Sequence, residues 1–159
     1  LYQYSVSGIG GIICSPTTST MLLKWKGATA FGGYTYPHQY IAGIAYDSGS
    51  KIYGNWTYNC ATIGSYGYNS YVRMMYSYQE LVRHLAYVGP VGVSVQGTVA
   101  GSQGSYDTNG HLMVVRGYSR SGTSVTFNIN DPAKNVAYTM TSTQLMNCWS
   151  AKKVAYVVE

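Results

Sequence analysis

The chain has 159 residues, of which 46% are hydrophobic and only 9% are charged, a composition that suits one compact domain and excludes a disordered segment. Ten Lys and Arg against five Asp and Glu give a net charge of +5, which favours anionic surroundings such as a cell wall, but no basic run exceeds two residues, so nucleic-acid binding is not expected. No stretch reaches the about 18 apolar residues of a membrane span.

Polarity in this chain comes mainly from Tyr, Ser, Thr, Asn and Gly rather than from Lys and Glu. That balance favours a secreted or cell-surface protein over a cytosolic one. The first residues lack the basic and apolar regions of a signal peptide, so we expect any such peptide to have been removed from this sequence.

The first predicted element is a helix over residues 14–27. Ser15 is a candidate N-cap, Pro16 suits the first helical position, and Gly27 marks the end of the helix. A glycine-rich segment precedes it. The thiol of Cys14 is therefore expected where a loop meets the positive end of a helix.

The rest of the chain predicts helices first and strands afterwards. Residues 28–78 are rich in Gly, Tyr, Asn and Ser, which indicates short helical turns and loops, with a short helix at 38–46. An amphipathic helix is expected at 80–88. Strands are predicted at 91–96, 112–118, 125–129 and 154–158, separated by turn clusters at 107–110 and 119–122. This order is typical of an α+β fold, with helices packed on a mainly antiparallel sheet.

Three cysteines without a CxxC spacing disfavour a structural zinc site, and no metal is expected. In an oxidising compartment Cys60 and Cys148 could pair and leave Cys14 free. The alternative is that all three are unrelated buried thiols. A thiol at a helix N-terminus has its pKa lowered, and the thiolate is the form that attacks a carbonyl.

A histidine and an aspartate lie at positions from which they could act with the Cys14 thiol. His111 opens the apolar strand at 112–118, and Asp131 ends the next predicted strand. In an antiparallel pair joined by a turn at 119–122, residues near 111 and near 129 lie side by side, so Asp131 can reach His111 and orient its ring. The alternatives are a histidine held by turn hydrogen bonds and an ordinary Asp-Pro turn. His38 and His84 are expected to be surface or packing residues.

Five segments in this order resemble papain-like cysteine peptidases, in particular the bacteriocin-processing, double-glycine-leader family and its secreted bacterial branch. The segments are Cys14-Ser15-Pro16-Thr17, Gly89-Pro90-Val91, residues 109–118 with the sequence NGHLMVVRGY, Asn130-Asp131-Pro132-Ala133, and Trp149 followed by residues 155–158. The resemblance covers nearly the whole chain and implies one papain-like peptidase domain over residues 1–159.

The resemblance also implies site residues. Cys14, His111 and Asp131 would form the catalytic triad, and a glutamine upstream of the cysteine would help the Cys14 backbone N–H to stabilise the oxyanion. Gln3 is the only glutamine before Cys14 and stands eleven residues away, farther than in the bacteriocin-processing enzymes. Those enzymes have Cys-Gly where this chain has Cys-Ser-Pro, so their leader specificity is not carried over.

The expected activity is hydrolysis of peptide bonds in a peptide or protein substrate, through a thioester acyl-enzyme and without metal or organic cofactor. Two alternatives remain open. A papain-fold module with little catalytic activity could bind cell-wall or surface ligands through its many tyrosines, although packing is the more ordinary role of these rings. A peptide transferase could use the same thioester chemistry.

Overall fold

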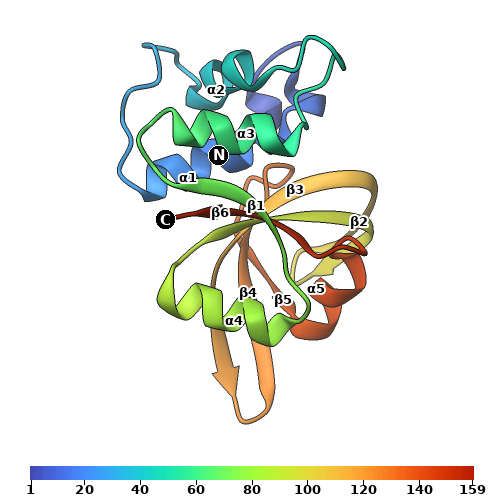
Figure 1. Ribbon diagram of the computed structural model, residues 1–159. Coiled ribbons are helices and arrows are strands. Elements are labelled where there is room, and N and C mark those ends of the chain that lie inside the picture. The colour runs from blue at the N-terminus through green and yellow to red at the C-terminus, as the bar shows by residue number, and fades with distance from the viewer.

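The computed structural model describes residues 1–159 and consists of two lobes that follow one another in the sequence (Figure 1). The N-terminal lobe is helical and lies against one face of a sheet, while two later helices cover the other face. The helices are α1 (Cys14–Trp25), α2 (Pro37–Ala45) and α3 (Trp56–Gly64) in the first lobe, and α4 (Tyr78–Tyr87) and α5 (Ser142–Cys148) in the second.

The sheet has six strands in the order β1-β6-β2-β3-β4-β5, and all neighbours are antiparallel. The strands are β1 (Ser70–Met74), β2 (Val91–Gly101), β3 (Gly104–Ser121), β4 (Ser124–Asn130), β5 (Tyr138–Thr141) and β6 (Val154–Val158). The expected α+β class, with helices on an antiparallel sheet, is therefore confirmed. None of the helices is long and apolar enough to cross a lipid bilayer.

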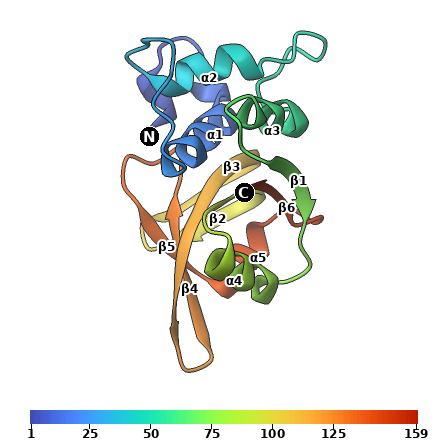
Figure 2. The same cartoon turned by 60° about the vertical axis from the view of Figure 1, so that its left-hand side comes forward.

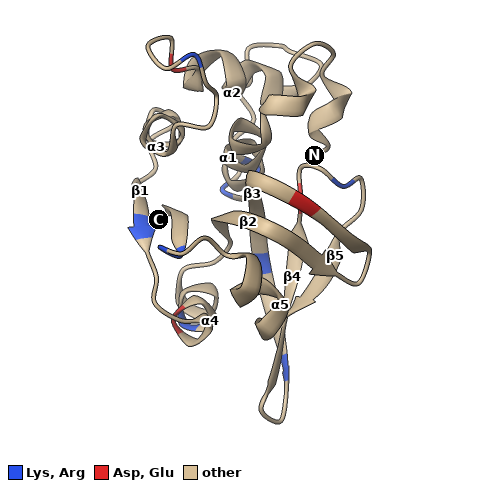
Figure 3. Ribbon diagram, turned by 90° about the vertical axis from the view of Figure 1, so that its right-hand side faces the viewer, with Lys and Arg blue, Asp and Glu red and all other residues tan.

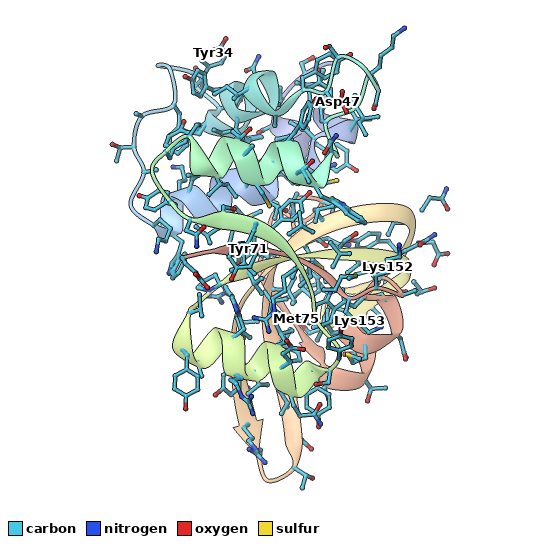
Figure 4. The ribbon with its side chains drawn as sticks, in the orientation of Figure 1. Tyr34, Asp47, Tyr71, Met75, Lys152 and Lys153 are labelled. Carbon is cyan, nitrogen blue, oxygen red and sulfur yellow. The ribbon has the colours of Figure 1, made fainter.

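The core is divided by the sheet into two clusters because successive side chains of a strand point to opposite faces. On β3, Leu112 and Val114 pack with the helical lobe, whereas Met113 and Val115 pack with the cluster on the other face. Met75 belongs to the second cluster and lies between the sheet and α4 (Figure 4).

Cys60 and Cys148 lie in different core clusters, one on each side of the sheet. All three cysteines are free thiols. The possible pairing of Cys60 with Cys148 is therefore wrong, because the sheet separates the two sulfurs.

Helix α1 begins two residues earlier than its capping signal predicts. Ile13 occupies the N-cap, and Cys14 is the first helical residue. The Ser15 hydroxyl does not cap the helix. It shares a 2.6 Å hydrogen bond with the hydroxyl of Tyr156 on β6, so this serine fastens the start of the helix to the sheet. Pro16 is tolerated because the first turn of a helix has free N–H positions.

The end of α1 follows the prediction. Gly27 has φ +91°, its N–H donates to Lys24 O, and the N–H of Ala28 donates to Leu23 O. These two bonds form a Schellman motif, which needs a residue in the left-handed region and so favours glycine.

Helix α1 packs very closely on the sheet. A Cβ on Gly92 of β2 would stand 2.9 Å from Thr18 Cγ2 and 3.1 Å from Tyr156 Cβ. The absence of a side chain at Gly92 therefore lets the helix approach the strand, and this approach sets the distance between the thiol on the helix and the residues on the sheet.

Several elements differ from the sequence prediction. The short elements β1, β5 and α5 were not predicted individually, since each has only four to seven residues. The turn expected at 107–110 is absent, because these residues continue β3 and pair with β2. The chain turns instead between Gly101 and Gly104, where Gly104 has φ +87°.

The tip of the β2–β3 hairpin folds over β5, so the sheet curls at this end (Figure 2). The N–H of Ser102 donates to Thr139 O at 2.9 Å, and the Thr139 N–H donates to Ser102 Oγ at 3.1 Å. Gly101 makes room for the ring of Tyr138, which a Cβ would meet at 2.7 Å. This docking brings the first residues of β3 and the strand β5 close to the end of β4.

Candidate active site

The structure brings Cys14, His111 and Asp131 together where the helical lobe meets the sheet. Cys14 is the first residue of α1, and His111 lies on β3. Both line one cavity of about 330 Å³. Asp131 lies just after β4, and its Oδ1 is 2.6 Å from His111 Nε2. The sulfur and the imidazole therefore share one cavity, and the imidazole is bonded to the carboxylate.

The register of β3 and β4 explains how His111 and Asp131 meet. Val115 pairs with Ile129, and a bulge follows between Val115 and Gly117. The prediction that residues near 111 and near 129 are paired is therefore wrong in register: Ile129 pairs with Val115, because the chain turns at residues 122–123, about two residues after the centre of the turn expected at 119–122. Asp131 nevertheless bonds His111. It follows the last residue of β4, so the strand pairing does not fix its position.

Asp131 is 2% exposed and accepts four hydrogen bonds. Besides His111, the N–H of Ala133 donates to Oδ1 at 2.8 Å, and the hydroxyls of Tyr106 and Tyr138 donate to Oδ2 at 2.6 Å and 2.9 Å. Burial alone would raise the pKa of Asp131, but the bond and charge of His111 and the other donors outweigh it and lower the pKa. The carboxylate is thus ionised.

His111 is buried, and burial alone would lower its pKa. The hydrogen bonds and charges of Asp131 and Cys14 outweigh this effect and raise the pKa of His111 to about 9. Because Nε2 is used by Asp131, Nδ1 is the ring nitrogen left for the thiol. The imidazole is therefore held as the cation through neutral pH.

Burial would also raise the pKa of Cys14, yet the net shift is downward. Hydrogen bonding to His111 and its positive charge contribute most to the lowering, followed by the backbone N–H groups of Leu112 and Ser15. In contrast, burial raises the pKa of both Cys60 and Cys148 to about 11. Cys14 is the thiol whose surroundings favour the thiolate.

Gln3 lies next to the Asp131 turn rather than in the cavity lining. It begins the short helix η1 (Gln3–Ser5), is 3% exposed, and its backbone N–H donates to Pro132 O at 2.9 Å. Its side-chain Oε1 is buried without a protein partner. The sequence therefore identified a buried glutamine near the site, but its side chain makes no hydrogen bond to Cys14.

The cavity has further polar lining residues that sequence reasoning did not single out. They are uncharged, and they come from the segment before and at the start of α3, from β2, from β3 and from the segment after α5. Trp56 forms one wall, and Gln96 and Ser150 supply polar groups. Trp56 lies in the segment 28–78, for which the sequence predicted only short helical turns and loops.

The other two histidines do not join the site. His38 is 1% exposed and its Nε2 hydrogen-bonds Ser5 Oγ at 3.2 Å, while His84 is 5% exposed on α4. Both are packing residues, as expected. No group of three or more His, Cys, Asp or Glu side chains is arranged to hold a metal ion.

Comparison with known proteins identifies the family and supports the fold. The model of the Peptidase_C39 like family matches residues 2–156. A crystal structure of a Bacillus anthracis protein assigned as a C39-like peptidase has the same fold, with a TM-score of 0.61, 15% sequence identity, and coverage of 92% of this chain and 88% of that chain. No curated protein matches the sequence. Because the family model spans nearly the whole chain, the protein belongs to the Peptidase_C39 like family.

Proposed function

We propose that this protein is a cysteine peptidase that hydrolyses peptide bonds with Cys14 as nucleophile, His111 as acid and base, and Asp131 as the group that orients the histidine. The observation that carries the proposal is the shared cavity of Cys14 and His111, together with the 2.6 Å bond from His111 to Asp131. The lowered pKa of Cys14 and the raised pKa of His111 favour a thiolate beside an imidazolium.

In the proposed reaction, the Cys14 thiolate attacks the peptide carbonyl carbon and forms a tetrahedral oxyanion. His111 donates its proton to the leaving amine as the C–N bond breaks, which leaves a thioester on Cys14. His111 then takes a proton from water, whose oxygen attacks the thioester and releases the acid and the thiolate. Asp131 stabilises the imidazolium in both steps.

The proposed oxyanion donors are the backbone N–H of Cys14 and the side-chain amide of Gln3. Support for Gln3 comes from its position beside the Asp131 turn. The amide N–H of such a side chain is a suitable donor to a developing oxyanion.

We further propose that residues 1–159 act as one peptidase domain on a peptide or protein substrate outside a bacterial cell, where cell-wall components are accessible. The low content of charged residues supports this location, and the charges that are present are thinly spread over both lobes (Figure 3). Finding the protein only in the cytosolic fraction of its source cells would contradict the location.

A binding role is the second candidate, and one feature favours it. Several tyrosines on the helical lobe are exposed, among them Tyr34 at 50% and Tyr58 at 46%, and Tyr34 stands at the outer side of that lobe (Figure 4). Aromatic rings can stack on sugar rings of a glycan. A protein that binds cell-wall fragments but does not cleave peptides would support this alternative.

Replacement of Cys14 distinguishes the two. We expect Cys14→Ala to lower the turnover of a mixed peptide library by roughly a thousandfold or more, since no other thiol lies in the cavity. Cys60→Ala is the matched control, because it removes a buried thiol in the helical lobe and should leave turnover unchanged.

Circular dichroism would check that both variants are folded, and mass spectrometry would identify the products. Full turnover by Cys14→Ala would contradict the peptidase proposal. New amide products formed when a free amine is added would instead identify a transferase, because the amine would then replace water in attacking the thioester.

A further inference from the structure

Two tyrosine hydroxyls converge on one oxygen of the aspartate. Tyr106 Oη on β3 donates to Asp131 Oδ2 at 2.6 Å, and Tyr138 Oη on β5 donates to the same oxygen at 2.9 Å. The other oxygen, Oδ1, accepts from His111 and from the N–H of Ala133. The carboxylate therefore has two donors on each oxygen, which fixes both its charge and its rotation.

The fold builds this pair with several tertiary contacts. Tyr138 lies in the space left by Gly101, where the hairpin tip docks on β5. The Tyr106 ring stands edge-on to His111, with centroids 6.0 Å apart and an interplanar angle of 82°. Lys134 Nζ lies 5.2 Å from the centre of the Tyr106 ring. The ring of Tyr106 is thus packed between the histidine and a lysine.

Neither tyrosine lines the cavity that holds Cys14 and His111. A substrate in that cavity does not touch their hydroxyls, so the pair can act on the reaction only through Asp131.

We propose that Tyr106 and Tyr138 are positioning residues whose hydroxyls keep Asp131 ionised and turned toward His111, and that they thereby set the pH below which the enzyme loses activity. This inference rests on the proposed peptidase function.

Loss of either tyrosine hydroxyl should move the acid limb of the pH profile to higher pH, because both hydroxyls donate to the Asp131 carboxylate. Removing a donor weakens the stabilisation of the carboxylate, so the pKa of Asp131 rises toward and beyond its ordinary range. Once protonated, Asp131 no longer holds the His111 imidazolium. Burial and the charge of Asp131 raise the pKa of Tyr106 and Tyr138, so both phenols stay protonated and act as donors throughout the working range.

Asp131 is the only carboxyl among the titratable groups in its surroundings. The others are His111 and Tyr106 from β3, Tyr138 from β5, Lys134 from the turn before β5, Cys148 from α5, the amino group of Leu1 at the same pocket and, through its contact with His111, Cys14 from α1. Tyr106 and Tyr138 bond Asp131 and do not line the cavity of Cys14, so a shift of the acid limb in variants of these tyrosines is assigned to Asp131.

The experiment compares Tyr106→Phe and Tyr138→Phe with Tyr118→Phe, by measuring kcat and KM on one peptide from acid to alkaline pH. Tyr118 is a half-buried tyrosine on β3 whose hydroxyl bonds no other residue, which makes it a matched control. We expect the acid limb to move up by about one pH unit in each of the first two variants. KM and the alkaline limb should stay as in the wild type, and Tyr118→Phe should match the wild type throughout.

A second measurement covers the case in which a Phe variant does not fold. Site-specific 3-fluorotyrosine at position 106 keeps the ring and hydroxyl but makes the phenol more acidic and hence a stronger donor. The acid limb should then move to lower pH. Folded variants whose acid limb does not move would overturn this inference alone, provided that turnover still requires Cys14. Turnover that does not require Cys14 would overturn the proposed function instead.

Discussion

Cys14 differs from the other two cysteines in its neighbours rather than in its degree of burial alone. Cys60 and Cys148 lie among apolar side chains, so burial is the main influence on them and raises each pKa to about 11. Around Cys14 the same burial penalty is exceeded by the His111 cation and by two backbone N–H groups. Reactivity at this residue is therefore a property of the contact between the two lobes.

Alkylation with iodoacetamide tests this difference. Cys14 should react at neutral pH, well below the range of an ordinary thiol, because its thiolate forms as the pH passes its lowered pKa. Peptide turnover should fall near pH 9, because His111 then loses the proton that it donates to the leaving amine.

Mass spectrometry of the labelled peptides would give the rate for each cysteine, and unfolding in urea should make the three rates alike. An onset of Cys14 labelling only near pH 9 would show that His111 does not stabilise the thiolate.

At the scale of elements, the short helix η1 is held in place from three sides. Its Gln3 N–H donates to Pro132 O, and Ser5 is bonded to His38 on α2. The next short helix, η2 (Gly10–Ile12), packs against it so closely that a Cβ on Gly10 would stand 2.9 Å from both Gln3 O and Tyr4 Cα. These contacts set the position of Gln3 beside the Asp131 turn.

Gly10→Ala should therefore displace η1 and lower kcat by on the order of tenfold, since small misplacements of a group that stabilises the transition state are costly. The backbone atoms that it meets cannot rotate away. Gly11→Ala is the matched control, because a Cβ there meets no atom within 4 Å.

Initial rates at saturating substrate, with circular dichroism to check folding, would measure the effect. If Gly10→Ala is folded and as active as the wild type, Gln3 has no part in stabilising the oxyanion.

For the whole molecule, catalysis depends on how the two lobes meet, because the thiol comes from the helical lobe and the imidazole from the sheet (Figure 1). Helix α1 joins them through the Ser15–Tyr156 hydrogen bond and through its contact with β2 at Gly92. A change at this contact should therefore affect stability and activity together.

Gly92→Ala tests that coupling. The added methyl group would meet Thr18 and Tyr156, and overpacking of this kind typically costs about 1–3 kcal/mol of unfolding free energy. We expect kcat/KM to fall as well, because the helix start must move relative to His111. Gly117→Ala on β3 should change neither quantity much, since its nearest atom, Asn128 Nδ2, is 3.8 Å away.

Urea unfolding curves and kcat/KM on one peptide would measure both effects. A destabilised Gly92→Ala variant with unchanged kcat/KM would show that the spacing of the lobes does not limit the reaction.

Local patterns and their order along the chain were sufficient to predict part of the fold and of the candidate site. The glycine that ends α1, the apolar run of β3 and the Asn-Asp-Pro turn after β4 are short-range signals, and they predicted a thiol at a helix start and a histidine next to an aspartate. The α+β order followed from the same patterns. The catalytic roles of Cys14, His111, Asp131 and Gln3 remain predictions.

The features that join distant segments depend on how the chain packs and could not be predicted from local patterns. Ser15 is a capping residue by local pattern, but its hydroxyl bonds Tyr156, 141 residues later. Tyr106 and Tyr138 are two of 18 tyrosines, and nothing local distinguishes them until the hairpin folds over β5 and places both hydroxyls on Asp131. Local propensity acts over a few residues, whereas a buried carboxylate needs donors from wherever the packed chain supplies them.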